Sequence, residues 1–147
     1  MPLIEEHIKS GNWLFKYRSY LPILLFILYF SGLIQMDKSA FLFQQSNWLI
    51  FCFCVSLLGQ FIRIVTVGKV PMDTSGRNTK LQKAGSINTF GIYSVVRHPL
   101  YLGNYFMWFG IFLLIPLLWV HVVFSLIYWF YYERIMIAEE EFLRGKF

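Results

Sequence analysis

Three long apolar stretches without a charged side chain constrain the fold of this chain more than any other feature. They cover residues 19–36, 39–62 and 99–132, which are 18, 24 and 34 residues long. A helix needs about 20 apolar residues to cross the hydrocarbon core of a bilayer. Of the 147 residues, 57% are hydrophobic and only 14% are charged, a balance that argues against a soluble domain. The sequence therefore predicts an all-α integral membrane protein.

The third stretch is too long to be one straight span. As a single helix its 34 residues would reach about 51 Å, whereas the hydrocarbon core is about 30 Å thick. Pro116 lies in the middle, and a proline inside a helix removes a backbone hydrogen bond and favours a kink or turn. We therefore expect a helical hairpin here. About four transmembrane segments follow, at residues 19–36, 39–62, 99–115 and 117–132.

The remaining residues form three polar segments of a single membrane domain, residues 1–147. With four spans, residues 1–18, residues 63–98 and a helix end at residues 133–147 all lie on one side. Twelve of the 13 basic residues fall on that side and only Lys38 lies opposite, so the positive-inside rule assigns it to the cytoplasm. The net charge of +5 then favours anionic lipids over nucleic acid. Residues 1–18 are expected to be an interfacial segment, either a short surface helix or a partly ordered tail.

Cysteine and histidine are too scattered to hold a metal ion. Cys52 and Cys54 lie inside the second apolar stretch, where buried thiols usually behave as small apolar side chains. His7, His98 and His121 are far apart in the sequence. We therefore expect neither a metal site nor a disulfide framework.

The segment at residues 63–98 is the longest polar stretch in the chain. Gly76, Gly85 and Gly91 favour turns in it and allow a backbone to approach a ligand closely. Loops of this length are usually functional or disordered. We expect this segment to be a cytoplasmic ligand-binding loop.

The helix predicted after this loop has charged residues at its N-terminal end, and residues 97–101 are called the helix mouth. Pro99 is a natural first helical residue, and His98 then lies at the helix end next to Arg97. The free amides near Leu100 and Tyr101 and the positive end of the helix dipole would attract a carboxylate. The alternative is that Arg97 anchors to lipid phosphate and His98 only caps a membrane helix.

Half of the eight acidic residues lie within the last fifteen positions, as Glu133, Glu139, Glu140 and Glu141. In isolation this cluster fits a solvated helix in which Glu140 pairs with Arg144, worth only about 0.2 to 0.5 kcal/mol. A hairpin, however, returns the cluster to the membrane face that holds the basic helix mouth. A basic and an acidic helix end around one pocket suit a zwitterionic amino-acid ligand.

These residues resemble the core of the isoprenylcysteine carboxyl methyltransferase and phospholipid methyltransferase family of integral membrane methyltransferases. The family core reads Arg-His-Pro-x-Tyr-x-Gly, then a helical hairpin, then Glu-Glu-x-x-Leu-x-x-x-Phe. The resemblance covers about residues 73–147, and the family's next stretch, Gly-x-x-Tyr-x-x-Tyr, has no counterpart, so we expect a form that is shortened relative to the family. The matching residues are Arg97, His98, Pro99, Tyr101 and Gly103, then Glu139, Glu140, Leu143 and Phe147.

The resemblance implies an S-adenosylmethionine-dependent methyltransferase that acts on a lipidic or prenylated acceptor at the cytoplasmic membrane face. It implies no Rossmann domain, and the sequence has no Gly-x-Gly-x-x-Gly motif. Arg97 and Glu140 are then the expected catalytic residues. Aromatic residues of the third stretch, namely Tyr105, Phe106, Trp108 and Phe109, are candidates to line a sideways acceptor route. The expected cofactor-binding residues are Tyr93, His98, Tyr101, Gly103, Asn104, Glu139 and Glu140.

Two functions from other classes remain open at this point. Some membrane sterol reductases resemble the same core but use a nicotinamide cofactor, although they are normally much longer. A non-catalytic membrane protein derived from the family is the other alternative. Within the methyltransferase interpretation, prenylcysteine, aminophospholipid, quinone-like and other polyisoprenoid acceptors are all compatible with the sequence.

Overall fold

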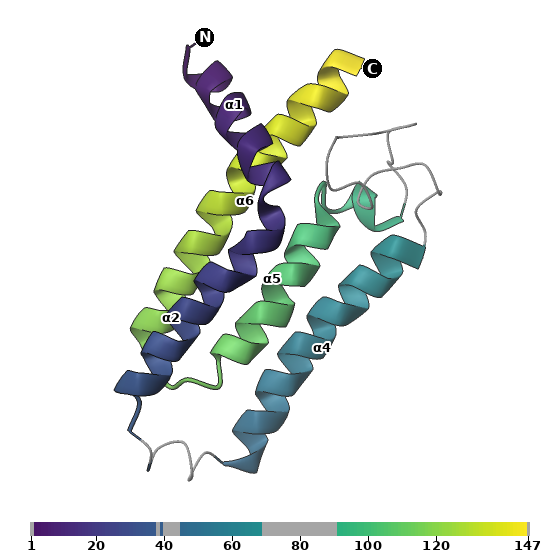
Figure 1. The fold of residues 1–147 in the computed structure, drawn as a ribbon. Helices are drawn as coiled ribbons and strands as arrows, with labels where there is room; N and C mark the ends of the chain where they lie inside the picture. The colour runs from purple at the N-terminus through teal and green to yellow at the C-terminus, as the bar shows by residue number, and fades with distance from the viewer. Residues whose placement is uncertain (1, 38, 40–44, 69–90, 147) are drawn as a thin grey trace.

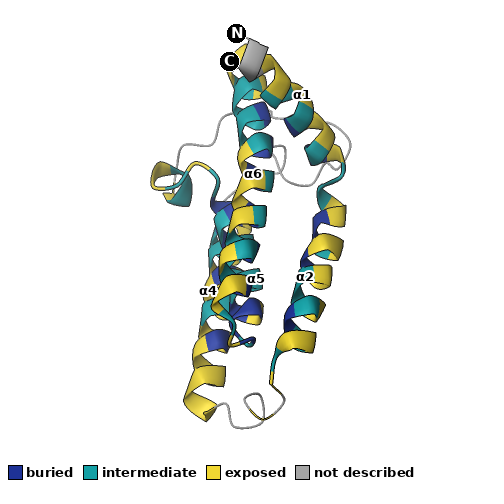
Figure 2. Cartoon of the chain, turned by 90° about the vertical axis from the view of Figure 1, so that its left-hand side faces the viewer, coloured by how far each residue is buried: buried dark blue, intermediate teal, exposed yellow. Residues whose placement is uncertain are grey.

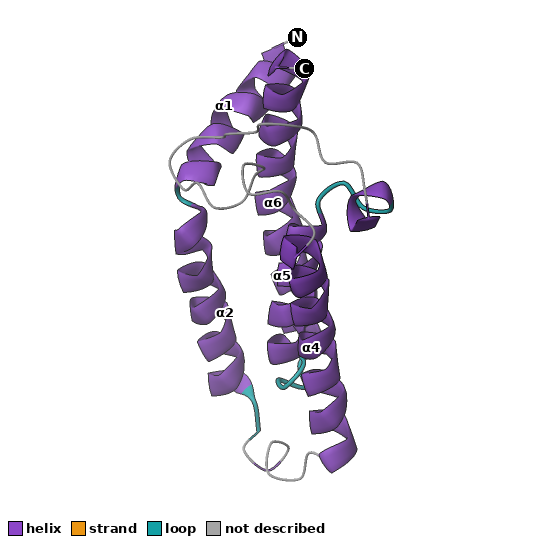
Figure 3. Ribbon diagram, turned by 90° about the vertical axis from the view of Figure 1, so that its right-hand side faces the viewer, coloured by secondary structure: helices purple, strands orange, loops and turns teal. Residues whose placement is uncertain are grey.

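A computed structural model of the chain describes residues 2–37, 39, 45–68 and 91–146. These residues form helices and turns without a strand, which confirms the all-α prediction for them (Figure 3). Most of the predicted ligand-binding loop, residues 69–90, lies outside the described residues. The α-helices are α1 Pro2–Lys16, α2 Leu21–Gln35, α4 Ser46–Gly68, α5 Pro99–Phe112 and α6 Leu118–Lys146, and the short 3-10 helices are η1 Arg18–Tyr20 and η2 Gly91–Ser94.

Two helical stretches are long and apolar enough to cross a membrane. They are Arg18–Gln35 and Ser46–Gly68, with mean hydropathies of 1.3 and 2.1. Only 17% of each stretch is buried, so most of its apolar side chains face outward (Figure 2). An outward apolar surface on both helices is what a hydrocarbon environment requires.

The other two predicted spans differ from this pattern. Helix α5 has 14 residues and measures about 21 Å, less than the hydrocarbon core. It stops at Phe112 rather than at residue 115, because Pro116 disfavours helix in the residues before it. Helix α6 runs from Leu118 through residues 133–146, where the sequence predicted a helix end beyond the span, and no glycine or proline interrupts it before Gly145. The four-span count stays a prediction.

Helix α4 is displaced towards the C-terminus relative to the predicted span at 39–62. It begins at Ser46 and reaches Gly68. Its extension carries Arg63, whose Nη1 lies 3.8 Å from the sulfur of Met107 on α5. The arginine stem can thus pack along an apolar helix while its charged head stays near the helix end.

Close packing of α4 on α5 depends on glycine. A Cβ added to Gly59 would lie 2.5 Å from the carbonyl oxygen of Gly103, and one added to Gly103 would lie 2.9 Å from the carbonyl oxygen of Gly59. Ser56 also donates to the Met107 carbonyl at 3.0 Å. Small residues of this kind let membrane helices approach each other closely.

Aromatic side chains join α5 to α6, and the two helices run antiparallel (Figure 1). Near the break at residues 113–117, the rings of Phe112 and Phe124 stack with centroids 4.3 Å apart. Towards the other end, Tyr128 donates a 2.6 Å hydrogen bond to the carbonyl of Tyr101. Phe112, Phe124 and Tyr128 are all fully buried, so this seam is the core of the molecule.

Helix α1 packs across the C-terminal half of α6, so the first residues of the chain are helical. Arg134 donates to Ser10 Oγ at 3.2 Å, and Tyr131 donates to the carbonyl of Leu14 at 3.1 Å. A Cβ on Gly11 would collide with the Arg134 backbone, so the contact is tight. Both chain ends therefore lie at the end of the molecule where α5 begins (Figure 1). Placement of α1 at a membrane interface stays a prediction.

Candidate active site

The first turn of α5 is built by two local constraints. Gly91 has φ 67°, a left-handed conformation that side chains disfavour, and it starts the short η2 turn. His98 has φ −126° and ψ 65°, which is non-helical, as expected for a residue before proline. Its ring does not cap α5 and instead faces α6. Pro99 then opens the helix.

Two adjacent glutamates of α6 converge on this turn. His98 Nε2 lies 3.2 Å from Glu140 Oε1, and His98 Nδ1 lies 3.6 Å from Glu139 Oε2. Tyr101 donates its hydroxyl hydrogen to Glu139 Oε1 at 2.7 Å. Residues about 40 positions apart in the sequence therefore form one polar cluster.

Arg97 makes the outermost contact of the cluster. Its Nη1 lies 3.5 Å from both carboxylate oxygens of Glu140. The Arg97 side chain is 82% exposed and that of Glu140 41%, so water screens the pair. Exposed pairs of this geometry contribute little to stability, at most about 1 kcal/mol. Arg97 is therefore available to a ligand.

Glu139 is the buried member of the carboxylate pair. Its pKa is raised above the ordinary value, chiefly because burial disfavours the charged form. The hydrogen bond from Tyr101 and the charges of His98 and Arg18 act in the opposite direction without cancelling the effect. A cationic ligand at Glu139 would reduce the cost of ionising this carboxyl.

The floor of the cluster is aromatic. The rings of Tyr101 and Tyr132 have centroids 4.6 Å apart, and Tyr132 and Tyr128 are 4.4 Å apart. The His98 ring stacks on Tyr101 at 5.8 Å with an interplanar angle of 22°. These contacts fix the orientation of the Tyr101 hydroxyl and the His98 ring towards α6.

A model of the phospholipid methyltransferase family matches residues 58–147. The match spans both halves of the cluster just described. The chain belongs to the phospholipid methyltransferase family. Neither a curated protein nor a solved structure matches the chain. Family membership together with the two apolar helices makes this a membrane protein with a methyltransferase fold whose substrates are related to lipids.

The polar cluster at the start of α5 contains five of the residues expected from the sequence: Arg97, His98, Tyr101, Glu139 and Glu140. Asn104 lies one turn further along α5, where its side chain reaches the Tyr132 hydroxyl. Tyr93 lies in η2, partly exposed. Gly103 faces α4 rather than the cluster, because a Cβ there would meet Arg63 Cγ at 2.8 Å.

Arg18 belongs to the electrostatic surroundings of the cluster and was not expected from the sequence. It lies in η1, with its guanidinium carbon 4.4 Å from the centroid of the Phe15 ring, and its charge acts on the Glu139 carboxyl. Arg18 precedes the family-matched region, and in the sequence it is only one of several basic residues before the first apolar stretch. The tertiary fold alone brings it to Glu139.

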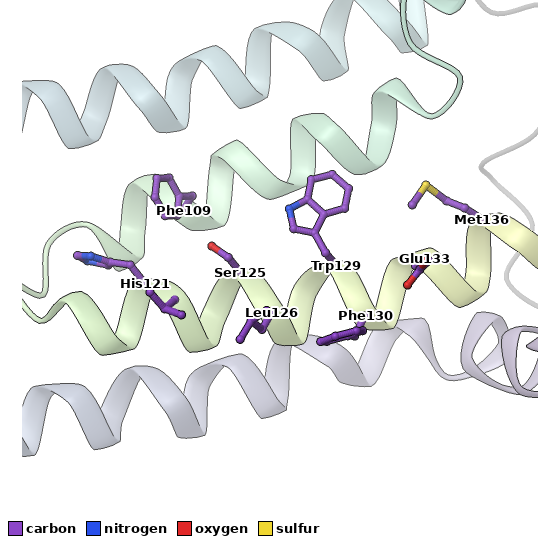
Figure 4. A pocket seen from close by; sticks show the side chains of 9 residues that line it. Phe109, His121, Ser125, Leu126, Trp129, Phe130, Glu133 and Met136 are labelled. Atoms are coloured by element: carbon purple, nitrogen blue, oxygen red, sulfur yellow. The ribbon is translucent and has the colours of Figure 1, made fainter.

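An apolar groove of about 700 Å³ runs along α6 on the membrane side of the cluster (Figure 4). Of the four aromatic residues suggested for an acceptor route, Phe109 reaches over the groove from α5, whereas Tyr105, Phe106 and Trp108 do not line it. Met136, at the end of the groove nearest the cluster, lies four residues before Glu140, which is about 6 Å along the helix axis. The lining residues are Phe109, His121, Val122, Ser125, Leu126, Trp129, Phe130, Glu133 and Met136.

Proposed function

We propose that this chain is an S-adenosylmethionine-dependent methyltransferase that methylates a lipidic or prenylated acceptor at the cytoplasmic face of the membrane. The observation that carries the proposal is the contact between the two linked motifs, in which His98 and Tyr101 at the mouth of α5 hold Glu140 and Glu139 of α6. Family membership supplies the reaction class.

The membrane arrangement in this proposal has four spans, with α2, α4, α5 and α6 each crossing once. Two observations support it: α5 and α6 run antiparallel around the break at Pro116, and the start of α1 and the end of α6 lie at one end of the molecule (Figure 1). Cysteines introduced at Gly91 and Glu141, in a background without Cys52 and Cys54, should both be labelled from the cytoplasmic side. Labelling from opposite sides would contradict the shared site.

The donor chemistry of the cluster fits the methionine end of the cofactor. Glu139 Oε1 is occupied by Tyr101, but Oε2 has no hydrogen bond among the described residues and its nearest ion-pair partner is 3.6 Å away. That oxygen, with those of Glu140, can accept an ammonium group. Arg97 and the free amides at the start of α5 can hold a carboxylate. When bound, S-adenosylmethionine supplies an electrophilic methyl group on a sulfonium.

The protein's own contribution to the reaction is alignment and the exclusion of water. His98 and Tyr101 orient the two carboxylates, and the tyrosine rings under them are buried. Holding two reactants in line can supply about 7 to 11 kcal/mol of the barrier reduction. Arg97 and Glu140 are the exposed members of the cluster and therefore the residues that can contact an acceptor.

Isothermal titration of the detergent-purified chain with S-adenosylhomocysteine tests the proposal without a known acceptor. We expect saturable binding that is weakened about 10- to 100-fold in His98→Ala, the effect of losing a hydrogen bond to a charged group. The matched control is His121→Ala, because His121 bonds the carbonyl of Phe112 far from the cluster. Wild-type chain that binds no S-adenosylhomocysteine, or equal binding by both variants, would overturn the proposal.

A further inference from the structure

The groove along α6 has one fixed charge, and it lies near the cytoplasmic end. Eight of the nine lining residues are apolar, aromatic or neutral polar side chains, and the ninth is Glu133. His121, the other titratable group, lies twelve residues earlier, about 18 Å away along the helix axis. A carboxylate beside a long apolar surface matches the outline of an amphiphile with a cationic headgroup.

Glu133 differs from the other three carboxylates near the end of α6. Glu139 and Glu140 contact the α5 mouth, and Glu141 lies 3.6 Å from Arg144. Within the described part of the chain, Glu133 forms no ion pair. The adjacent cation, Arg134, is turned towards α1, where it donates to Ser10 Oγ at 3.2 Å. Glu133 is exposed to solvent, and its side chain lines the groove.

Aromatic rings flank Glu133 on the same face of α6. Trp129 precedes it by four residues and Phe130 by three, the two helical spacings that bring side chains together, and both line the groove (Figure 4). Aromatic faces attract ammonium groups, by about 0.5 to 2 kcal/mol each. A carboxylate and two rings together form a cation-selective end to an apolar groove.

We propose that Glu133 is a specificity-determining residue that selects an acceptor with an ammonium headgroup, whose apolar chain lies in the groove from Trp129 towards His121. This inference rests on the proposed methyltransferase function. Glu133 and Glu140 are seven residues apart, so they share one face of α6 and are separated by about 10 Å. An anionic acceptor would be repelled by Glu133 and by the Glu139–Glu140 pair, which excludes carboxylate acceptors from this site.

The same residue can take the proton that amine methylation requires. An ammonium nitrogen has no lone pair, so it first transfers one proton to the Glu133 carboxylate. The neutral nitrogen then forms a bond to the methyl carbon while the carbon–sulfur bond breaks and its electron pair remains on sulfur. The product is a methylated ammonium beside a thioether, and the proton on Glu133 passes to water when the product leaves. The positive charge of the sulfonium has moved to nitrogen, so atoms and charge balance.

A binding measurement separates this inference from the proposed function. Oleoylcholine and oleate carry the same chain with opposite headgroup charge, and both can be titrated into the full chain in nanodiscs of neutral lipid. Wild-type protein should bind oleoylcholine at least tenfold more tightly than oleate, and Glu133→Gln should remove most of that preference. Glu141→Gln is the matched control and should retain it. Equal affinity of the wild type for both probes, or an unchanged preference in Glu133→Gln, overturns the inference.

Two further readouts complete the test. S-adenosylhomocysteine binding should stay within about twofold of wild type in Glu133→Gln, because this residue is about 10 Å from Glu140 in the proposed cofactor site. If the wild-type protein itself does not bind S-adenosylhomocysteine, the proposed function fails instead. With dioleoylphosphatidylethanolamine as acceptor, Glu133→Gln should raise KM and also lower kcat, because it removes both the headgroup contact and the proton acceptor. If the protein binds the cofactor and methylates N-acetyl-S-farnesylcysteine but not dioleoylphosphatidylethanolamine, the assignment of Glu133 to an ammonium headgroup is overturned.

Discussion

The two ends of the α5–α6 pair are built on opposite principles. Near the break at Pro116, Phe112 and Phe124 stack at 4.3 Å and are almost completely buried, so the contact is apolar. At the other end the contacts are charged or polar, and Arg97 is 82% exposed. Dispersion between close-packed rings stabilises the first end, whereas the second keeps groups that are only partly satisfied and can therefore bind a ligand. Stability and function are separated along one helix pair, and variants should affect one without the other.

The largest expected effect is on the apolar end. Phe124→Ala should lower the free energy of unfolding by about 3 to 5 kcal/mol, because it removes a buried ring and leaves a cavity against Phe112. Unfolding by a denaturing detergent, followed by circular dichroism, measures this. Under conditions where the variant is folded, its affinity for S-adenosylhomocysteine should match wild type. A large loss of affinity with little loss of stability would contradict the separation.

Glu139→Gln should weaken cofactor binding without lowering stability, the reverse of Phe124→Ala. Cofactor affinity should fall about 10- to 100-fold with the loss of a charged acceptor, while stability at neutral pH should be unchanged or raised, since a buried carboxylate is replaced by a neutral amide. Titration calorimetry and the same unfolding assay give the two values. Glu141→Gln, two positions away and paired with Arg144, provides the reference.

The raised pKa of Glu139 predicts a pH dependence with a defined sign. Because the folded-state pKa lies above the unfolded value, the ionised carboxyl costs stability, and that cost disappears as pH falls through the interval between the two values. Cofactor affinity should change in the opposite direction, because an ammonium group needs the ionised form. Affinity should therefore weaken on acidification, starting above the ordinary glutamate pKa. Glu139→Gln should lose this part of the profile, and an unchanged profile would show that another group is responsible.

Tyr101→Phe should have an intermediate effect. It removes the 2.7 Å hydrogen bond to Glu139 and leaves the ring stack with Tyr132 intact. We expect a three- to tenfold loss of cofactor affinity, in line with about 0.5 to 1.5 kcal/mol for one hydrogen bond. The acid weakening of affinity should also begin at higher pH, since the hydrogen bond favours the ionised form. Calorimetry at several pH values measures both changes.

The smallest effect is expected from breaking the exposed ion pair. Arg97→Gln should change the free energy of unfolding by less than about 0.5 kcal/mol, because water already screens its contact with Glu140. If Arg97→Gln has a larger effect, it should be on the rate of methyl transfer to an acceptor and not on stability. A loss of stability comparable to that of Phe124→Ala would remove the distinction between the two ends.

Local sequence patterns were sufficient to predict the helical class, the non-helical break at Pro116 and a helix start at Pro99. Each depends on short-range chemistry: an apolar run, a missing amide hydrogen, or a proline that fixes a helix start. The residues that meet at the α5 mouth were instead expected from the hairpin and the family resemblance. The spacing of the glutamates did not show that both Glu139 and Glu140 would reach the mouth, since one helical face holds only one of them. Their side chains reach it from two sides, towards Tyr101 and towards His98.

Long-range packing accounts for what the sequence did not show. The position of α1 depends on Gly11 meeting the Arg134 backbone, which no local pattern indicates. Gly103 has a motif spacing that suggests a ligand, yet it provides the close approach to Gly59 on α4. Arg18 approaches Glu139 only because α1, η1 and α2 wrap around α6. Helix α4 ends at Gly68, beyond the predicted span at 39–62, because an uncharged run marks where lipid contact ends rather than where helical hydrogen bonding ends.

Because α6 is uninterrupted, it fixes the distance between the groove and the carboxylates. Its 29 residues extend for about 43 Å and carry both the groove and the carboxylates. Glu133 and Glu140 therefore keep a fixed spacing on the same side of the helix, which the helical pitch sets rather than a movable loop. One alanine inserted between Met136 and Ile137 would turn the later residues by about 100° and advance them by about 1.5 Å. Such a change leaves every side chain present but points the two halves of the site in different directions.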